Sequence, residues 1–172
     1  MCFYYDLNGD FSIMSELRTN RIVPRDGLTS GAYGGIIQVK YASASTYQSY
    51  SSTDYGDVTG ASVSITPTRS DSAIILLLTT SMNQNASSTR VRYRVQRDIG
   101  GGGYSTLFTI HEALVDYEGQ NIHVQGIGNN FIDTPSTTSA VTYKLQVASS
   151  SGNEIQINNN GRTDMILMEI AG

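Results

Sequence analysis

The densest group of ionisable side chains in the sequence begins at His111. Glu112 follows directly, and Asp116 and Glu118 come shortly after it. Enzymes that hydrolyse polysaccharides use two carboxyl groups about 5 to 10 Å apart, on either side of the glycosidic bond. Glu112 and Asp116 are the pair that this chemistry would use. His111 and His123 are expected to face each other on neighbouring strands.

A structural role for this segment is the favoured interpretation. A histidine on a strand is more often a hydrogen-bonded sheet residue than a base or a ligand, because catalysis needs a third group to orient it. A small β-domain is also expected to lack the long groove that holds a polymer. We therefore predict that the chain is not an enzyme and has no catalytic residues.

Metal and phosphate motifs are incomplete in this sequence. The segment Asp6–Asp10 begins like a calcium loop, but Phe11 stands where the loop needs glycine and Leu17 where it needs a bidentate glutamate. Gly100–Gly103 lacks the lysine and the Ser/Thr of a phosphate-binding loop. Cys2 is the single cysteine, so neither an intrachain disulfide nor a zinc site is expected. We predict no metal and no cofactor.

The charge pattern argues against nucleic acid as a partner. The formal net charge is −4, and a nucleic-acid binder needs clustered cations. The main basic run is Arg90, Arg92, Arg94 and Arg97, of which the first three share the solvent face of one predicted strand. We interpret it as a solvated, partly ion-paired face rather than an anion site. No stretch approaches 18 apolar residues and none resembles a secretion signal, so membrane insertion is not expected either.

The elements that position these side chains are predicted to be short strands. Residues 140–147 alternate between apolar and polar side chains, which is typical of a half-buried strand. Strands without intervening helices predict an all-β fold, an antiparallel jelly-roll-like β-sandwich over residues 35–172, preceded by an extended N-terminal arm, residues 1–34. The predicted strands lie near residues 35–42, 46–52, 61–66, 72–82, 89–98, 104–114, 121–133, 140–149, 153–158 and 163–170.

Two turns carry glycine signals. Asn160-Gly161 favours a tight hairpin between residues 153–158 and the last strand, since a type I′ turn needs positive φ at both central residues. Gly100–Gly103 is expected at the tip of a second hairpin.

Two predicted strands are apolar on both faces, namely residues 73–78 and 165–170. One face of an antiparallel sandwich is normally wet, so such strands need a second cover. We expect another subunit to provide it. The residues predicted for this oligomer interface are Ile75, Leu77, Met165 and Leu167.

Three tyrosines lie in a stretch rich in serine and threonine: Tyr47, Tyr50 and Tyr55. An exposed tyrosine gives a binding site contact area at low entropic cost. Strand alternation cannot bury all three on one face. They form a candidate recognition surface, and burial of Tyr47 and Tyr55 in the core is the alternative.

Five segments together carry a family resemblance: Gly60–Pro67, Ser72–Leu76, Asp133–Pro135, Ser139–Val147 and Met165–Ile170. In this order they resemble small β-domains of bacteriophage virion proteins, described as structural or tail-fibre domains in phages of marine bacteria and cyanobacteria. The resemblance spans about residues 35–172. It implies a virion protein that assembles in the host cytoplasm.

The resemblance also gives the arm a role, because similar arms precede the domain in these phage proteins. Its glycine-rich end has much entropy to lose, so we expect contacts on a neighbouring protein to order it. The residues predicted to anchor it in the virion are Arg18, Arg21, Ile22, Val23, Pro24 and Arg25.

The leading hypothesis is a homotrimeric surface appendage of the short tail-fibre or receptor-binding type. Its expected partners are other virion proteins of the tail or capsid and a host-surface glycan, contacted by the loops around Tyr47–Tyr55 and Gly100–Gly103. A capsid decoration protein is the alternative, and a polysaccharide-cleaving depolymerase is a distant one.

Overall fold

The structure, a computed structural model, describes residues 35–84, 86, 89–110 and 122–171. These residues belong to one compact unit, Tyr33–Gly172, and form ten strands and no helix. The predicted arm lies outside the described residues, so its boundary stays a prediction. The strands are β1 (Ile36–Ala44), β2 (Gln48–Tyr50), β3 (Gly56–Ile65), β4 (Ala73–Gln84), β5 (Val91–Ile99), β6 (Tyr104–Ile110), β7 (Ile122–Asp133), β8 (Val141–Ser149), β9 (Ile155–Ile157) and β10 (Thr163–Ile170).

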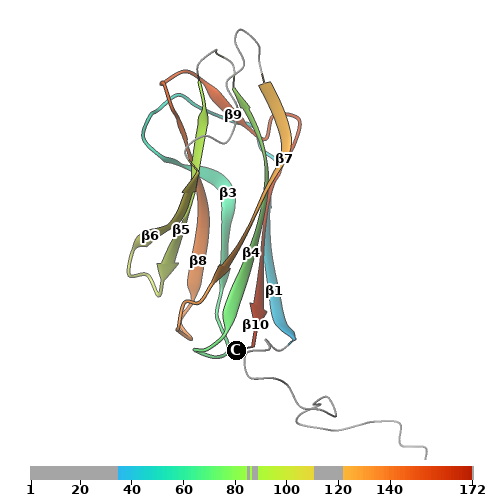
Figure 1. Cartoon of the computed structure of the whole chain (residues 1–172), viewed down its shortest axis with the longest axis vertical. Helices are drawn as coiled ribbons and strands as arrows, with labels where there is room; N and C mark the ends of the chain where they lie inside the picture. Colours follow the sequence, from blue (N-terminus) through green and yellow to red (C-terminus); the bar gives the residue numbers. More distant parts are fainter. Residues whose placement is uncertain (1–34, 85, 87–88, 111–121, 172) are drawn as a thin grey trace, which may run out of the picture. The chain divides into compact units, whose positions relative to one another are not determined.

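The strands form two antiparallel sheets that pack as the two layers seen in Figure 1. One is six-stranded, in the order β1-β10-β4-β9-β2, with β7 paired to the other edge of β4. The other is four-stranded, in the order β3-β8-β5-β6. The predicted all-β, jelly-roll-like β-sandwich is confirmed.

The core between the sheets follows the predicted alternation. Val141, Tyr143, Leu145 and Val147 of β8 are fully buried, and Thr142, Lys144 and Gln146 alternate with them. On β4, the side chains of Ile74, Leu76 and Leu78 are buried, so those between them point to the outer face. The four-stranded sheet thus has one wet face, whereas the six-stranded sheet has apolar residues on both.

The strand β4 organises the six-stranded sheet. β10 pairs with its residues 73–79 and β9 with its residues 82–84 on the same edge, while β7 runs along the opposite edge. β9 and β10 therefore lie end to end, and the predicted Asn-Gly hairpin between them is wrong. Asn158 and Asn160 do adopt positive φ, at 61° and 57°. The turn that contains these two residues carries the chain further along the same edge of β4, whereas a hairpin turn would fold it back on β9.

A polar contact joins the two sheets at the end where β7 stops. Asp133 of β7 accepts hydrogen bonds from Arg97 Nη1 at 2.7 Å and from the Tyr143 hydroxyl at 2.7 Å, both from the four-stranded sheet. Burial, together with the Asp133 carboxylate, raises the pKa of Tyr143, so its hydroxyl stays protonated. The hydrogen bonds that Asp133 accepts therefore hold the two sheets together at this end.

Glu169 of β10 is fully buried at the same end of β4. Its carboxylate accepts from Gln38 Nε2 at 2.6 Å, from the Thr68 amide and hydroxyl at 2.7 and 2.8 Å, and from the Ser72 hydroxyl at 2.7 Å. Burial raises the pKa, but these four donors outweigh it and lower the pKa to about 2. The carboxylate therefore attaches the segment 66–72 to the sheet. All four of these hydrogen-bond donors are neutral groups.

Candidate functional site

The outer face of the six-stranded sheet is sorted into rows by the register of its strands. Side chains of paired residues lie beside each other on one face. From one end, the rows are Val39, Met168, Ile75 and Ile132; then Tyr41, Ile166, Leu77 and Asn130; then Ser43, Asp164, Thr79 and Gly128. The first two rows contain no Asp, Glu, Lys, Arg or His, and charge begins only in the third.

Much of this face is exposed. Four of the seven large hydrophobic residues that are exposed in the described chain belong to it: Val39 at 51%, Tyr41 at 78%, Ile132 at 60% and Ile36 at 59%. Ile36 pairs with Ile170 below the first row. We define the outer apolar face by the residues Ile36, Val39, Tyr41, Ile75, Leu77, Ile132, Ile166, Met168 and Ile170. A soluble monomer rarely leaves such a contiguous face uncovered.

The predicted oligomer-interface residues divide between the two faces. Ile75 and Leu77 are half-buried and lie on the outer apolar face, where a partner could reach them. Met165 and Leu167 are fully buried in the core, so their assignment to an interface is corrected. The residues of β10 that point outward are Ile166 and Met168.

Sequence reasoning missed the margins of this face, on β1 and β7. The inward face of β10 could have been predicted, because alternation along the strand places Thr163, Met165, Leu167 and Glu169 on one face. The exposure of Val39 and Ile132 follows from tertiary pairing. Nothing in the sequence alone places β1 and β7 beside the same two strands.

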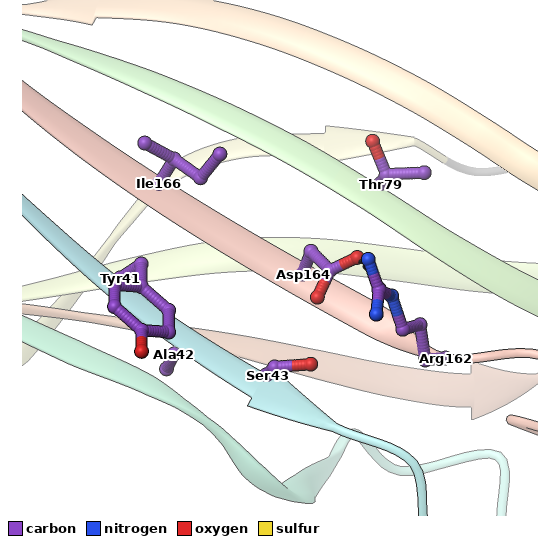
Figure 2. A pocket seen from close by; sticks show the side chains of 7 residues that line it. All are labelled: Tyr41, Ala42, Ser43, Thr79, Arg162, Asp164 and Ile166. Carbon is purple, nitrogen blue, oxygen red and sulfur yellow. Dashed lines mark hydrogen bonds and ion pairs between the residues drawn. The ribbon is translucent and has the colours of Figure 1, made fainter.

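A groove of about 330 Å³ lies at the charged end of the outer face, and Figure 2 shows the side chains around it. Tyr41 and Ser43 come from β1, Thr79 comes from β4, and Asp164 comes from β10. Arg162, immediately before β10, donates from Nε to Asp164 Oδ2 at 2.7 Å. Ala42 and Ile166 complete the lining.

The wall of this groove is held by the turn between β9 and β10. Asn158 donates its backbone N–H to the Ser81 carbonyl at 3.0 Å, and its side-chain Oδ1 accepts from the Thr163 hydroxyl at 2.8 Å. A Cβ on Gly161 would lie 2.5 Å from Ser81 Cβ, so only glycine lets the turn approach β4 this closely. Arg162 thus follows a turn with a fixed path.

The three tyrosines of the predicted recognition surface have different surroundings. Tyr47 is 50% exposed, and its hydroxyl donates to Glu154 Oε1 at 3.0 Å. Tyr50 is half-buried against the core and donates to the Asp57 carbonyl at 2.7 Å. The Tyr55 ring lies 4.3 Å from the Arg94 guanidinium carbon. Of the three, Tyr47 offers the freest surface.

The basic run serves the fold of the four-stranded sheet. Arg92 donates to the carbonyls of Thr53 and Ser149 at 2.9 and 2.7 Å, which fastens the segment before β3 to this sheet. Arg94 donates to Gln146 Oε1 at 2.7 Å. With Arg97 bound to Asp133, these guanidinium groups are engaged by the protein itself.

The two loops expected to contact the host lie at opposite ends of β8. Tyr55 precedes Gly56, which pairs with Val147, whereas Ile99, beside the glycine turn, pairs with Val141. Six residues of strand separate the two positions by about 20 Å. Tyr47–Tyr55 and Gly100–Gly103 therefore do not form one surface.

Several predicted residues lie outside the described part of the chain. These are the anchor residues Arg18, Arg21, Ile22, Val23, Pro24 and Arg25, the ionisable cluster His111, Glu112, Asp116 and Glu118, and the side chain of His123. Within residues 35–84, 86, 89–110 and 122–171, no group of His, Cys, Asp or Glu is arranged to hold a metal ion. The same residues include no helix that is long and apolar enough to cross a membrane.

Comparison with known proteins places the chain in no family. No family model matches it, and the search of curated proteins found no match. Among solved structures, a chain from the structure of infectious bursal disease virus, Gx strain, aligns with 86% of this chain at 10% identity and a TM-score of 0.34. The match covers 44% of that viral chain, so this chain spans less than half its length. A likeness this weak supports no inference about function.

Proposed function

We propose that this protein is a non-enzymatic structural protein of a bacteriophage virion. In this proposal the β-sandwich is a self-associating surface appendage of the short tail-fibre or receptor-binding type, and the N-terminal arm anchors it. The motifs at Gly60–Pro67, Ser139–Val147 and Met165–Ile170, which resemble phage virion domains, support the assignment to a virion.

The observation that carries the proposal is the outer apolar face. Its first two rows have no charged side chain, and apolar residues are exposed at both margins, with Val39 on β1 and Ile132 on β7. Depletion of charge at the centre of a surface patch is typical of protein interfaces. Every copy of the chain carries both apolar margins, so a second copy can cover them.

A threefold arrangement suits the position of these margins. Three strand spacings, about 14 Å, separate β1 from β7. If Val39 at the β1 margin of one subunit packs on Ile132 at the β7 margin of the next, the contact is heterologous, and a rotation of about 120° between neighbours closes it after three copies. Trimers of similar jelly-roll heads provide an analogy for this geometry.

Attachment is assigned to residues 1–34. Ile22 and Val23 are expected to supply apolar contacts and Pro24 to favour an extended chain. Arg18, Arg21 and Arg25 are expected to pair with acidic groups on the acceptor. Capsid decoration remains the alternative, because an arm of this kind and an apolar face would also serve a protein that clamps capsomers.

The test uses virions assembled without this protein. The full-length chain, added to such particles and located by immuno-electron microscopy, is expected at the tail. The variant Ile22→Asp/Val23→Asp should lose attachment, whereas the control Val58→Ala, altered in the core and not in the arm, should keep it. Even coverage of the capsid would favour decoration, and failure of the wild-type chain to attach at all would contradict a virion role.

A further inference from the structure

We propose that the groove beside Tyr41 binds one pyranose unit of a neutral glycan. This inference rests on the proposed receptor-binding role and gives it a ligand class and a location. The groove lies in the charged third row of the outer face, between β1, β4 and the start of β10 (Figure 2).

The polar atoms of the groove are available to a ligand. No residue in the described part of the chain hydrogen-bonds to the hydroxyl groups of Tyr41, Ser43 or Thr79. Arg162 engages Asp164 through Nε alone, which leaves its two terminal nitrogens and Asp164 Oδ1 for other partners. Hydroxyl groups that both donate and accept, next to a carboxylate and a guanidinium, match the vicinal diol of a sugar.

The apolar atoms of the groove complement a sugar ring as well. The Tyr41 side chain is 78% exposed in the single chain, and Ile166 lies next to it in the same row. The proposed subunit contact between Val39 and Ile132 lies in the neighbouring row and leaves the Tyr41 ring open to the groove. A rigid aromatic ring offers contact area to the C–H face of a pyranose at low entropic cost. A ligand site of this kind combines an apolar wall with a few placed polar groups.

Other ligand classes fit the same groove less well. An inorganic anion would meet one guanidinium whose charge is offset by the Asp164 carboxylate. A purely apolar ligand would desolvate three hydroxyl groups without giving them partners. Nucleic acid would find a single cation where it needs several. The groove also holds one carboxylate, whereas glycoside hydrolysis needs two, so binding rather than cleavage is expected.

The wall that carries Arg162 is fixed before a ligand arrives. The close approach of Gly161 to Ser81 and the bonds of Asn158 hold the turn on β4. A site whose parts are already in place loses less entropy on binding.

The experiment measures sugar binding by saturation-transfer difference NMR on the full-length protein. The probes are the methyl glycosides of glucose, galactose, mannose and N-acetylglucosamine. We expect saturation transfer to at least one of them. Tyr41→Ala and Asp164→Asn should each weaken its binding at least tenfold. The control is Tyr104→Ala, which removes an exposed tyrosine of the four-stranded sheet and should change the Kd less than twofold.

Sedimentation and thermal melting of the same variants separate this inference from the proposed function. Asp164→Asn lies outside the apolar rows and should keep the oligomeric state and the melting temperature of the wild type. Absence of transfer to all four sugars would overturn the glycan site, even if the protein self-associates. Sugar binding that Tyr41→Ala and Asp164→Asn leave unchanged would overturn its location. A monomeric protein that binds sugar through Tyr41 would retain the site and contradict the trimer.

Discussion

Glu169 shows how a single residue acts in this fold. A carboxylate removed from water is costly unless donors replace its hydration, and four donors do so here. Three of them come from the segment between β3 and β4, and one comes from β1. The charge therefore couples the last strand to parts of the chain about 100 residues earlier.

The substitution Glu169→Gln is expected to destabilise the protein. The new amide group would face the Gln38 amide, so one donor loses its acceptor, and the charge-assisted bonds become neutral. We expect the free energy of unfolding at pH 7 to fall by about 1–3 kcal/mol, measured by urea denaturation. The control Asp71→Asn removes an exposed carboxylate and should have little effect.

The pH dependence of the same variant gives a second check. The pKa of Glu169 is about 2 in the folded protein, against 4.5 for an unperturbed glutamate, so its stabilisation is complete above about pH 4.5 and is lost as the pH falls towards 2. The difference between wild type and Glu169→Gln should shrink over this range. A difference that stays constant would mean that the carboxylate is not stabilised as described.

Individual contacts were predictable only in part from the sequence. The predicted solvent face of Arg92 and Arg94 agrees with the structure, in which Val91, Tyr93 and Val95, the residues that alternate with them, are buried. It could not predict that Arg94 covers Tyr55, because segments far apart in the chain meet there. The groove was missed for the same reason, since Tyr41 and Asp164 become neighbours only when β1 pairs with β10.

At the scale of the elements, the strands themselves were predicted from the sequence, but the pairing of β9 and β10 was not. Ten strands were expected and ten are found in the described residues, because alternation and turn residues are local signals. The pairing of β9 and β10 was wrong, since a turn residue with positive φ fixes the local path and not the partner. β3 also begins earlier than predicted, at Gly56, because an irregularity between Asp57 and Ser62 lets the strand continue through Gly60, at φ 83°.

The turn between β9 and β10 can be tested at Gly161. In Gly161→Ala the new Cβ would approach Ser81 Cβ to 2.5 Å, so the turn must move. We expect a loss of about 1–3 kcal/mol in unfolding free energy by urea denaturation. Gly128→Ala is the matched control, because the nearest atom to its Cβ is 3.9 Å away.

A double variant isolates this contact. Adding Ser81→Gly removes the side chain that the new methyl group meets, so Ser81→Gly/Gly161→Ala should recover part of the stability. A Gly161→Ala protein as stable as the wild type would show that the turn is not held against β4.

On the scale of the whole molecule, the main asymmetry is between the outer faces of the two sheets. The four-stranded sheet covers its outer side with Arg94, Gln146, Lys144 and Asp57, joined by hydrogen bonds and an ion pair. The six-stranded sheet presents its apolar rows instead. The sequence predicted that residues 73–78 need a second cover, and the structure places Ile75 and Leu77 on the side where that cover is missing.

Self-association through this face is the central claim, and sedimentation equilibrium of the full chain at micromolar concentration tests it most directly. We predict a mass three times the chain mass of 18.6 kDa. Ile132→Asp changes a side chain that is 60% exposed, so it should leave the fold intact and yield a monomer, because it places a charge in the contact. Tyr104→Asp, at an exposed position of the four-stranded sheet, should remain trimeric. A wild-type monomer, or an Ile132→Asp protein with an unchanged mass, would contradict the account.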